Sequence, residues 1–227
     1  YAIGFFTVTS VAGRLMERMG VGLLLATAGW VAVVALVGYA TAASWAMLLV
    51  AASVLGASGG AFDAGFNAFT ALELDARSLN LLHAGYGIGA TLGPWMMTVM
   101  VASGAGWRIG IAVAVVVKLV VAAAISRTAP TWNLTPHDER TPAPARAGRA
   151  IVVAALVLFF LYTGVELIAG QYAFTFLSEG RGVDITVAGP AAGGFWLGLT
   201  LARILLGMLG ERGRPQALVS GATPGTG

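Results

Sequence analysis

Long apolar stretches, separated by short polar segments, dominate the pattern of this chain. Six of them are long enough to be membrane-crossing helices, since a bilayer core of about 30 Å takes roughly 20 apolar residues. They cover residues 21–40, 45–71, 81–103, 108–126, 151–177 and 185–209. The strands of a transmembrane β-barrel would instead alternate polar and apolar positions in short segments. The pattern therefore predicts an all-α membrane protein with several spans.

The composition agrees with that prediction. Of the 227 residues, 58% are hydrophobic and 10% are charged, whereas a soluble domain carries about 25% charged residues. Such a chain cannot cover a water-facing surface, so we expect it to lie in a lipid bilayer. The net charge of +3 does not indicate nucleic acid, because the basic residues fall in short segments between the apolar stretches.

The arginines at the ends of the apolar stretches and between them are unevenly divided between the two sides of the membrane. Counted in alternate loops, nine lie on one side and two, Arg108 and Arg181, on the other. The nine are Arg14, Arg18, Arg77, Arg127, Arg140, Arg146, Arg149, Arg212 and Arg214. Because Lys and Arg favour cytoplasmic loops, we expect the side with nine to face the cytoplasm. We expect a multi-pass, monomeric protein of the plasma (inner) membrane.

The segment 127–150 divides the chain, because it is long, polar and rich in proline, as flexible linkers are. We predict a first helical bundle over 1–126, a cytoplasmic linker over 127–150, and the start of a second bundle over 151–227. The first apolar run, residues 1–12, would extend only about 18 Å as a helix. We therefore expect the chain to be a fragment that begins inside a helix of a longer protein.

A short charged motif, GRLMERMG, follows that first run, and GMLGERGR at 207–214 shares its pattern G-x-L-x-E-R. The motif residues of the first copy are Gly13, Arg14, Glu17, Arg18 and Gly20. The two glycines suit a tight turn. We expect the glutamate at a helix N-terminus, where the backbone dipole favours a negative charge, and the two arginines are placed to pair with carboxylates of neighbouring helices.

This motif resembles the loop motif G-x-L-a-D-r-x-G-r-k of the major facilitator superfamily, which lies between the second and third of twelve helices. Glutamate stands in place of the aspartate of that pattern, and Val21 and Gly22 stand in place of its last two basic residues. The resemblance implies an incomplete major facilitator-type helical bundle covering about helices two to eight. Repeated halves are the common plan of secondary transporters.

One carboxylate lies in the interior of an apolar stretch. Asp63 is about nine residues, or about 13 Å, from the expected cytoplasmic end of its helix, in a run from about 45 to 72 with no other charge. A charge at that depth costs about 2.5–3.5 kcal/mol on insertion scales, so it usually faces a cavity or a partner. Asn67 lies one turn later on the same helical face. We expect a functional role for Asp63, whereas Asn67 could equally join helices by a hydrogen bond.

Polar residues also open the next apolar stretch, LNLLHAGYGIGATLGP at 79–94. Asn80 and His83 share a helical stripe, with Tyr86 beside them. Because the loop before them is short, this helix should run antiparallel to the helix of Asp63. We expect these polar residues to contribute to the same site, and Asn80 could also serve only to join helices.

Glu166 repeats the situation in the second half, as the only charge in LFFLYTGVELIAGQYAFTFL. Two isolated carboxylates in opposite halves suit a central chamber that binds a polar solute and a proton. A carboxyl removed from water can be held neutral and can release its proton on hydration. This behaviour is a physical basis for coupling transport to protons.

The combination of DAGFN, the stretch 79–94 and FFLYTGVE resembles fucose permease-like sugar transporters of the same superfamily, over most of 55–210. The resemblance implies that a site for sugar and protons is formed by Asp63, Asn67, Asn80, His83, Tyr86 and Glu166. It implies a secondary active transporter that carries a sugar together with protons by alternating access.

Two alternatives stay open. A drug or metabolite exporter of the same superfamily would be favoured by a large apolar cavity and by exchange, and a membrane protein that does not transport is the third possibility. An enzyme would need a nucleophile with its base or a metal cluster, yet the chain has two histidines and no cysteine. We therefore expect no enzymatic activity, no metal site and no cofactor. The roles of Lys118 and Arg203, which also lie in apolar stretches, stay open, and Trp196 is more typical of packing than of sugar binding.

Overall fold

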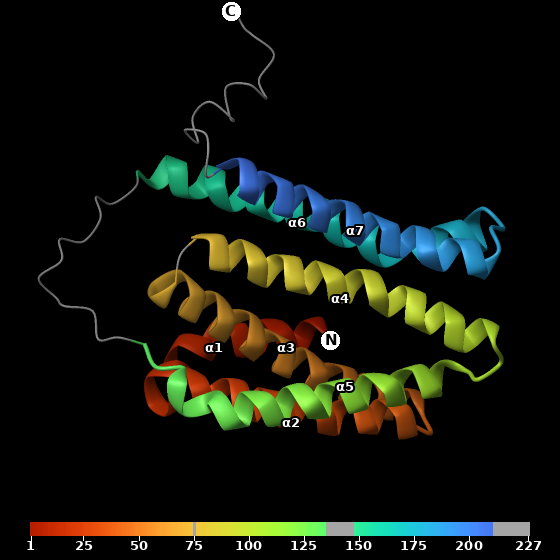
Figure 1. Ribbon diagram of the computed structural model, residues 1–227, viewed down its shortest axis with the longest axis horizontal. Coiled ribbons are helices and arrows are strands. Elements are labelled where there is room, and N and C mark those ends of the chain that lie inside the picture. The colour runs from red at the N-terminus through yellow and green to blue at the C-terminus, as the bar shows by residue number, and fades with distance from the viewer. Residues whose placement is uncertain (75, 135–147, 211–227) are drawn as a thin grey trace, which may run out of the picture. The chain divides into compact units, whose positions relative to one another are not determined.

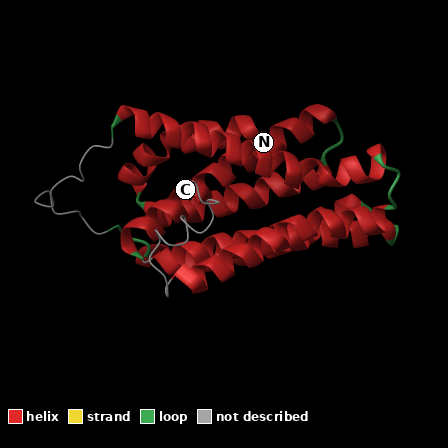
Figure 2. Ribbon diagram, turned by 90° about the horizontal axis from the view of Figure 1, so that it is seen from above, coloured by secondary structure: helices red, strands yellow, loops and turns green. Residues whose placement is uncertain are grey.

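The computed structural model describes residues 1–74, 76–134 and 148–210 (Figure 1). Every regular element within these ranges is a helix, as Figure 2 shows. The elements are α1 (Ala2–Met19), α2 (Val21–Thr41), α3 (Trp45–Glu73), α4 (Ala76–Ala102), α5 (Trp107–Thr128), the 3₁₀ turn η1 (Ala129–Thr131), α6 (Arg149–Thr175), the π-helical segment η2 (Phe176–Gly180) and α7 (Ile185–Gly210). The predicted all-α fold class is confirmed.

Five of the described helices are long and apolar enough to cross a membrane. They are Val21–Thr41, Trp45–Glu73, Trp107–Thr131, Arg149–Gly180 and Ile185–Leu205. These five correspond to five of the six predicted spans. The sixth, 81–103, corresponds to the 27-residue helix α4, Ala76–Ala102, and stays a prediction as a span. It falls outside the group because glycines and polar residues spread along the whole helix lower its mean hydropathy.

The tight turn predicted for the charged motif forms at Gly20, between α1 and α2, but not at Gly13. Gly13, Arg14, Glu17 and Arg18 all belong to α1. The helix breaks only at Gly20, whose φ of +78° is a conformation that favours glycine. Glu17 lies in the last turn of α1, so the expectation of a helix N-terminus is wrong, and Arg18 supplies the cation that a helix C-terminus favours. The charged side chains of the motif are exposed. The end of a helix allows this exposure as readily as a loop does.

Contacts divide the chain into two units. The first consists of Tyr1–Asp75 and Met100–Thr141 and contains α1, α2, α3 and α5. The second consists of Ala76–Val99 and Pro142–Gly227 and contains most of α4 together with α6 and α7. Most of the predicted linker, residues 135–147, and the last part of the second motif copy, from residue 211, lie outside the described residues. The boundaries predicted from sequence stay a prediction.

Small and polar residues fix α3 within the first unit. Gly56 of α3 lies so close to the backbone of Tyr1 that a Cβ would not fit there, a kind of close approach that small residues give to membrane helices. On the α2 side, the hydroxyl of Ser58 donates a buried hydrogen bond of 2.7 Å to the carbonyl of Ala28. Leu25 of α2 is fully buried in the adjoining core. α3, which carries the first predicted carboxylate, is thus held on both sides.

Arg108, at the start of α5, forms hydrogen bonds with carbonyl groups at the end of α2. Its Nε donates to the carbonyl of Ala40 and its Nη2 to that of Ala42, each at 3.2 Å. Its guanidinium also lies 4.5 Å from the ring centre of Trp107. Since the last carbonyls of a helix have no partners within the helix, this arginine satisfies groups that would otherwise need water.

In the second unit, α4 packs on α7 through close contacts. Gly87 of α4 lies against the side chain of Thr200 with no room for a Cβ. Further along, the indole of Trp95 donates a hydrogen bond of 3.1 Å to the carbonyl of Pro190. These contacts join the middle and the second half of α4 to α7.

Candidate functional site

Asp63 and Asn67 form a hydrogen-bonded pair on α3. The Asn67 amide nitrogen donates to the Asp63 carboxylate Oδ1 at 3.0 Å and to the Asp63 carbonyl at 2.8 Å. The Asp63 side chain is exposed and that of Asn67 is half-buried. Among the described residues, no ion pair includes Asp63. The sequence-based expectation that these two share a helical face is confirmed, and the carboxylate is held by a neutral amide.

Lys118 of α5 lies close to this pair along α3. Its Nζ is 4.2 Å from the ring centre of Phe62, the residue before Asp63, and the Phe62 ring stacks on Phe66 at 5.6 Å. An ammonium over an aromatic face is stabilised by the negative face of the ring. Lys118 is therefore a packed residue of the first unit, a role that the sequence left open.

Glu166 is not an isolated charge. Its carboxylate Oε1 lies 3.2 Å from Nη2 of Arg203 on α7. The same Nη2 donates to the hydroxyl of Tyr162 at 3.4 Å. The exposed fractions of the side chains are 14% for Glu166 and 27% for Arg203. Sequence analysis found the carboxylate but missed its partner, which lies 37 residues further along the chain.

An aromatic contact lies next to this ion pair. The Tyr86 ring of α4 meets the Trp196 ring of α7 edge to face, with 5.8 Å between centres. The Trp196 ring is 7% exposed and rests on Gly170 of α6, where no Cβ would fit. Gly170 follows Glu166 by four residues, so both face the same side of α6. The expectation that Trp196 packs rather than lies open to solute is confirmed.

The other two predicted residues of α4 are accessible. Asn80 is exposed and His83 is half-buried. Both precede the contact of Gly87 with Thr200 and lie toward the start of the helix. Both side chains therefore remain able to donate and accept hydrogen bonds.

The predicted site residues are divided between the two units. Asp63 and Asn67 belong to the first, and Asn80, His83, Tyr86 and Glu166 belong to the second. Within the second unit, α7 joins the elements of Tyr86 and Glu166 through its residues Trp196 and Arg203. A single chamber formed by both groups stays a prediction.

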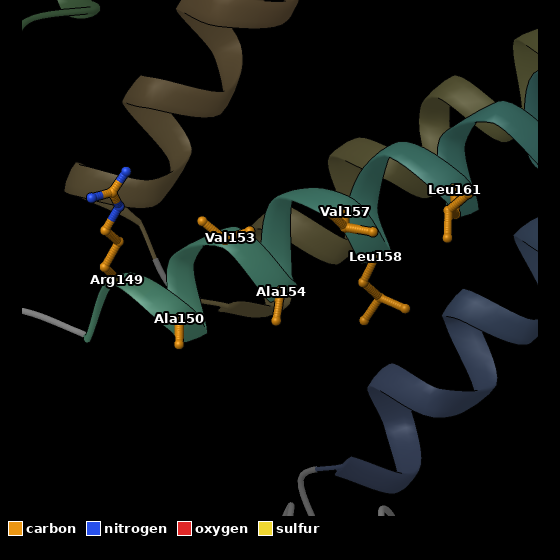
Figure 3. A pocket seen from close by; sticks show the side chains of 7 residues that line it. All are labelled: Arg149, Ala150, Val153, Ala154, Val157, Leu158 and Leu161. Atoms are coloured by element: carbon orange, nitrogen blue, oxygen red, sulfur yellow. The ribbon is translucent and has the colours of Figure 1, made fainter.

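A hollow of about 760 Å³ lies along α6 and is drawn in Figure 3. Its lining residues are Arg149, Ala150, Val153, Ala154, Val157, Leu158 and Leu161. Apart from Arg149 these side chains are aliphatic, and all of them come from one helix. A polar solute would find no convergent hydrogen-bonding groups there, so this hollow is not the candidate site.

Several helices that are long and apolar enough to cross a membrane are typical of a multi-pass membrane protein. The sequence profile of the Major Facilitator Superfamily matches residues 1–226. The chain belongs to this superfamily, which comprises membrane transporters rather than enzymes.

The chain is also similar to Bypass of stop codon protein 6 of Saccharomyces cerevisiae (strain ATCC 204508 / S288c), with 38% identity over 63 residues. That match covers 28% of this chain and 12% of the yeast protein, so the chain spans a small part of that relative. No solved structure matches the chain significantly.

Proposed function

We propose that the protein is a secondary active transporter of the plasma (inner) membrane that carries a sugar together with protons by alternating access. Membership of the superfamily supports the transporter class. The observation that carries the proton coupling is the environment of Asp63, whose carboxylate accepts a hydrogen bond from the Asn67 amide. An amide leaves the charge of the carboxylate uncompensated, so a proton can neutralise it.

The position of Asp63 suits a proton site that opens to water during transport. It lies ten residues before Glu73, the last residue of α3, which corresponds to about 15 Å along the helix. That distance is half of a bilayer core of about 30 Å. At such a depth a negative charge is unfavourable. Protonation of Asp63 therefore lowers the barrier to reorientation, and loss of the proton on the other side restores the charge.

Asn67, Asn80, His83 and Tyr86 are proposed to bind the sugar, with Glu166 as the second acid of the chamber. Sugar hydroxyls both donate and accept hydrogen bonds, as amides, imidazole and phenol do. The motif residues at the end of α1, Arg14, Glu17 and Arg18, are proposed to face the cytoplasm as a gating segment that ends at Gly20. The protein is proposed to work as a monomer.

Uptake into proteoliposomes tests this function. The reconstituted protein is given a panel of radiolabelled hexoses and deoxyhexoses, with and without an inward proton gradient. The gradient is expected to drive accumulation of at least one sugar. Asp63→Asn is expected to abolish this accumulation and to leave exchange of sugar across the membrane. Asp184→Asn is the matched control, because it removes an exposed carboxylate outside the spans.

Two results would contradict the proposal. Undiminished accumulation in Asp63→Asn would remove this residue from the coupling mechanism. Failure to take up any sugar, together with export of apolar dyes, would favour an exporter of the same superfamily.

A further inference from the structure

A groove of about 420 Å³ follows the exposed side of α2 and reaches α3, within the first unit. It is lined by Thr27, Trp30, Val31 and Val34 of α2 and by Val54 of α3. The four residues of α2 have the spacing i, i+3, i+4 and i+7, so they form one face of the helix. All of the lining residues except Val31 are exposed. Because α2 is long and apolar enough to cross a membrane, we expect this face to meet lipid.

The polar groups that line the groove already have hydrogen-bond partners. The indole of Trp30 donates to the hydroxyl of Ser126 on α5 at 3.0 Å, and that hydroxyl donates to the carbonyl of Ala122. The hydroxyl of Thr27 donates to the carbonyl of Leu23 in its own helix at 2.8 Å. Among these described lining side chains, no hydrogen-bond donor is left for a polar solute. The groove therefore suits an acyl chain.

The packing of α5 on α2 brings a cation to one end of the groove. Gly22 lies so close to the carbonyl of Ala129 that no Cβ would fit, and seven residues later Gly29 approaches Ala122. In this antiparallel register, Arg127 is level with α2 about one turn before the groove begins. Its side chain is exposed, and no carboxylate of the described residues forms an ion pair with it. The charge of Arg127 is therefore available to an anion at that end.

We propose that the groove and Arg127 bind one anionic phospholipid of the surrounding membrane, with the phosphate at Arg127 and an acyl chain along Thr27 to Val34. A guanidinium matches the geometry of a phosphate, and anionic lipids belong to the cytoplasmic leaflet, the side on which we expect this arginine. The seven steps from Thr27 to Val34 cover about 10 Å, which fits within half of a bilayer core of about 30 Å. The hydrogen bond of Trp30 with Ser126, the residue before Arg127, joins the two parts of the site.

Quenching of tryptophan fluorescence by brominated lipid tests the site in the full chain. The protein is reconstituted in phosphatidylcholine vesicles that contain the same fraction of either dibrominated phosphatidylglycerol or dibrominated phosphatidylcholine. Bromine on an acyl chain quenches an indole that it contacts, and the difference between the unaltered protein and Trp30→Phe isolates the signal of Trp30. One basic residue favours an anionic headgroup by about fivefold. Phosphatidylglycerol is therefore expected to occupy the groove about fivefold more than phosphatidylcholine does.

Three variants assign the preference to the groove and its arginine. Arg127→Gln is expected to quench equally with the two lipids, because the cation is gone. Arg77→Gln, which removes an exposed arginine of the second unit, is the matched control and is expected to keep the fivefold preference. Val34→Phe places a ring in the groove at an exposed position, so it is expected to reduce the quenching of Trp30 by phosphatidylglycerol.

Equal quenching of Trp30 by the two lipids in the unaltered protein would overturn the inference, since lipid would then cover the groove without selection. An undiminished preference in Arg127→Gln would also overturn it, because the phosphate would then lie elsewhere. If neither lipid quenches Trp30, protein rather than lipid covers the groove, and the inference is wrong. Solute transport plays no part in these measurements, so their outcome is independent of the proposed function.

Discussion

The ion pair of Glu166 and Arg203 allows a quantitative prediction of its contribution to stability. The perturbation is a double-mutant cycle made of Glu166→Gln, Arg203→Met and the two combined. Glutamine keeps the shape of the acid and methionine keeps much of the apolar stem of the arginine, so each single change removes mainly charge. The energy of coupling between the two changes then measures the interaction of the pair.

The magnitude follows from the 3.2 Å separation of the two charged atoms. Coulomb's law gives about 5 kcal/mol at an effective dielectric constant of about 20 and about 1 kcal/mol in bulk water. Since 27% of Arg203 and 14% of Glu166 are exposed, the pair lies between these limits. Removing the charges from water opposes the attraction. We expect a net coupling of about 2 kcal/mol, equivalent to a factor of about 30 in the unfolding equilibrium.

The assay is equilibrium unfolding by denaturing detergent in mixed micelles, followed by tryptophan fluorescence. The control cycle combines Arg203→Met with Asp184→Asn, because Asp184 precedes the other end of α7 and lies 19 residues away. Its coupling is expected to be zero within error. A coupling below about 1 kcal/mol for Glu166 with Arg203, the range of exposed pairs, would refute the assignment of a partly buried ion pair.

Three further changes test the packing and the helix ends by the same unfolding assay. Arg108→Met, which leaves carbonyls at the end of α2 without their donors, is expected to lower the free energy of unfolding by about 1 kcal/mol. Gly170→Ala is expected to lower it by about 1–3 kcal/mol, because the added methyl group overlaps the buried Trp196 ring. The pKa of Asp184 is lowered by hydrogen bonds from the hydroxyl and backbone N–H of Thr186. The ionised Asp184 side chain therefore contributes its full stabilisation above the ordinary pKa of an aspartate, and this contribution is lost as the pH falls through the lowered pKa. Asp184→Ala should therefore make the free energy of unfolding less dependent on pH in the acid range.

Each of these expectations has its own control. Gly164→Ala lies on the same helix as Gly170 but meets nothing within 4 Å, so it should not destabilise the protein. Equal losses in the two glycine variants would indicate an effect of helix position rather than of overlap with Trp196. For Arg108, Arg108→Lys should recover part of the loss, and no loss in Arg108→Met would show that water replaces the arginine fully. If the free energy of unfolding of Asp184→Ala depends on pH in the acid range as strongly as that of the unaltered protein, the stabilising role of the hydrogen bonds between Asp184 and Thr186 is contradicted.

The spans could be predicted from the sequence because apolar length alone determines them. The stretch 185–209 corresponds to α7 at Ile185–Gly210 and the stretch 45–71 to α3 at Trp45–Glu73. The helix ends depend instead on local hydrogen bonds. The start of α3, for example, is fixed by Ser44, whose hydroxyl accepts from the backbone N–H of Met47 at 3.3 Å. The end of α1 was misplaced because charged residues in the last turn of a helix resemble a loop in sequence.

Some of the contacts of the candidate site residues could be predicted from the sequence. The carboxylates stood out because each is alone in its stretch, and the pairing of Asp63 with Asn67 follows from helical spacing. The partner of Glu166 was missed because its sequence position carries no such spacing. A signal was present: α6 and α7 form a hairpin, and side chains of helical residues point back toward the helix start. For Arg203 that direction is toward the hairpin loop, which brings the guanidinium closer to the depth of Glu166 on the antiparallel helix.

Close contacts between helices could not be predicted from composition. Gly170 and Gly87 are two of 32 glycines, and only the packing distinguishes them as positions where Trp196 and Thr200 approach the backbone. The cation–π contact of Lys118 with Phe62 likewise depends on how α5 meets α3, which periodicity does not determine.

The proton flux that accompanies solute entry tests the central claim most directly. Weakly buffered proteoliposomes are given a transported solute in the absence of any gradient, and the external pH is recorded. The account predicts alkalinisation with the unaltered protein and with Asp184→Asn, and none with Asp63→Asn. Alkalinisation of equal size in Asp63→Asn, or solute entry without any change of pH in the unaltered protein, would contradict it.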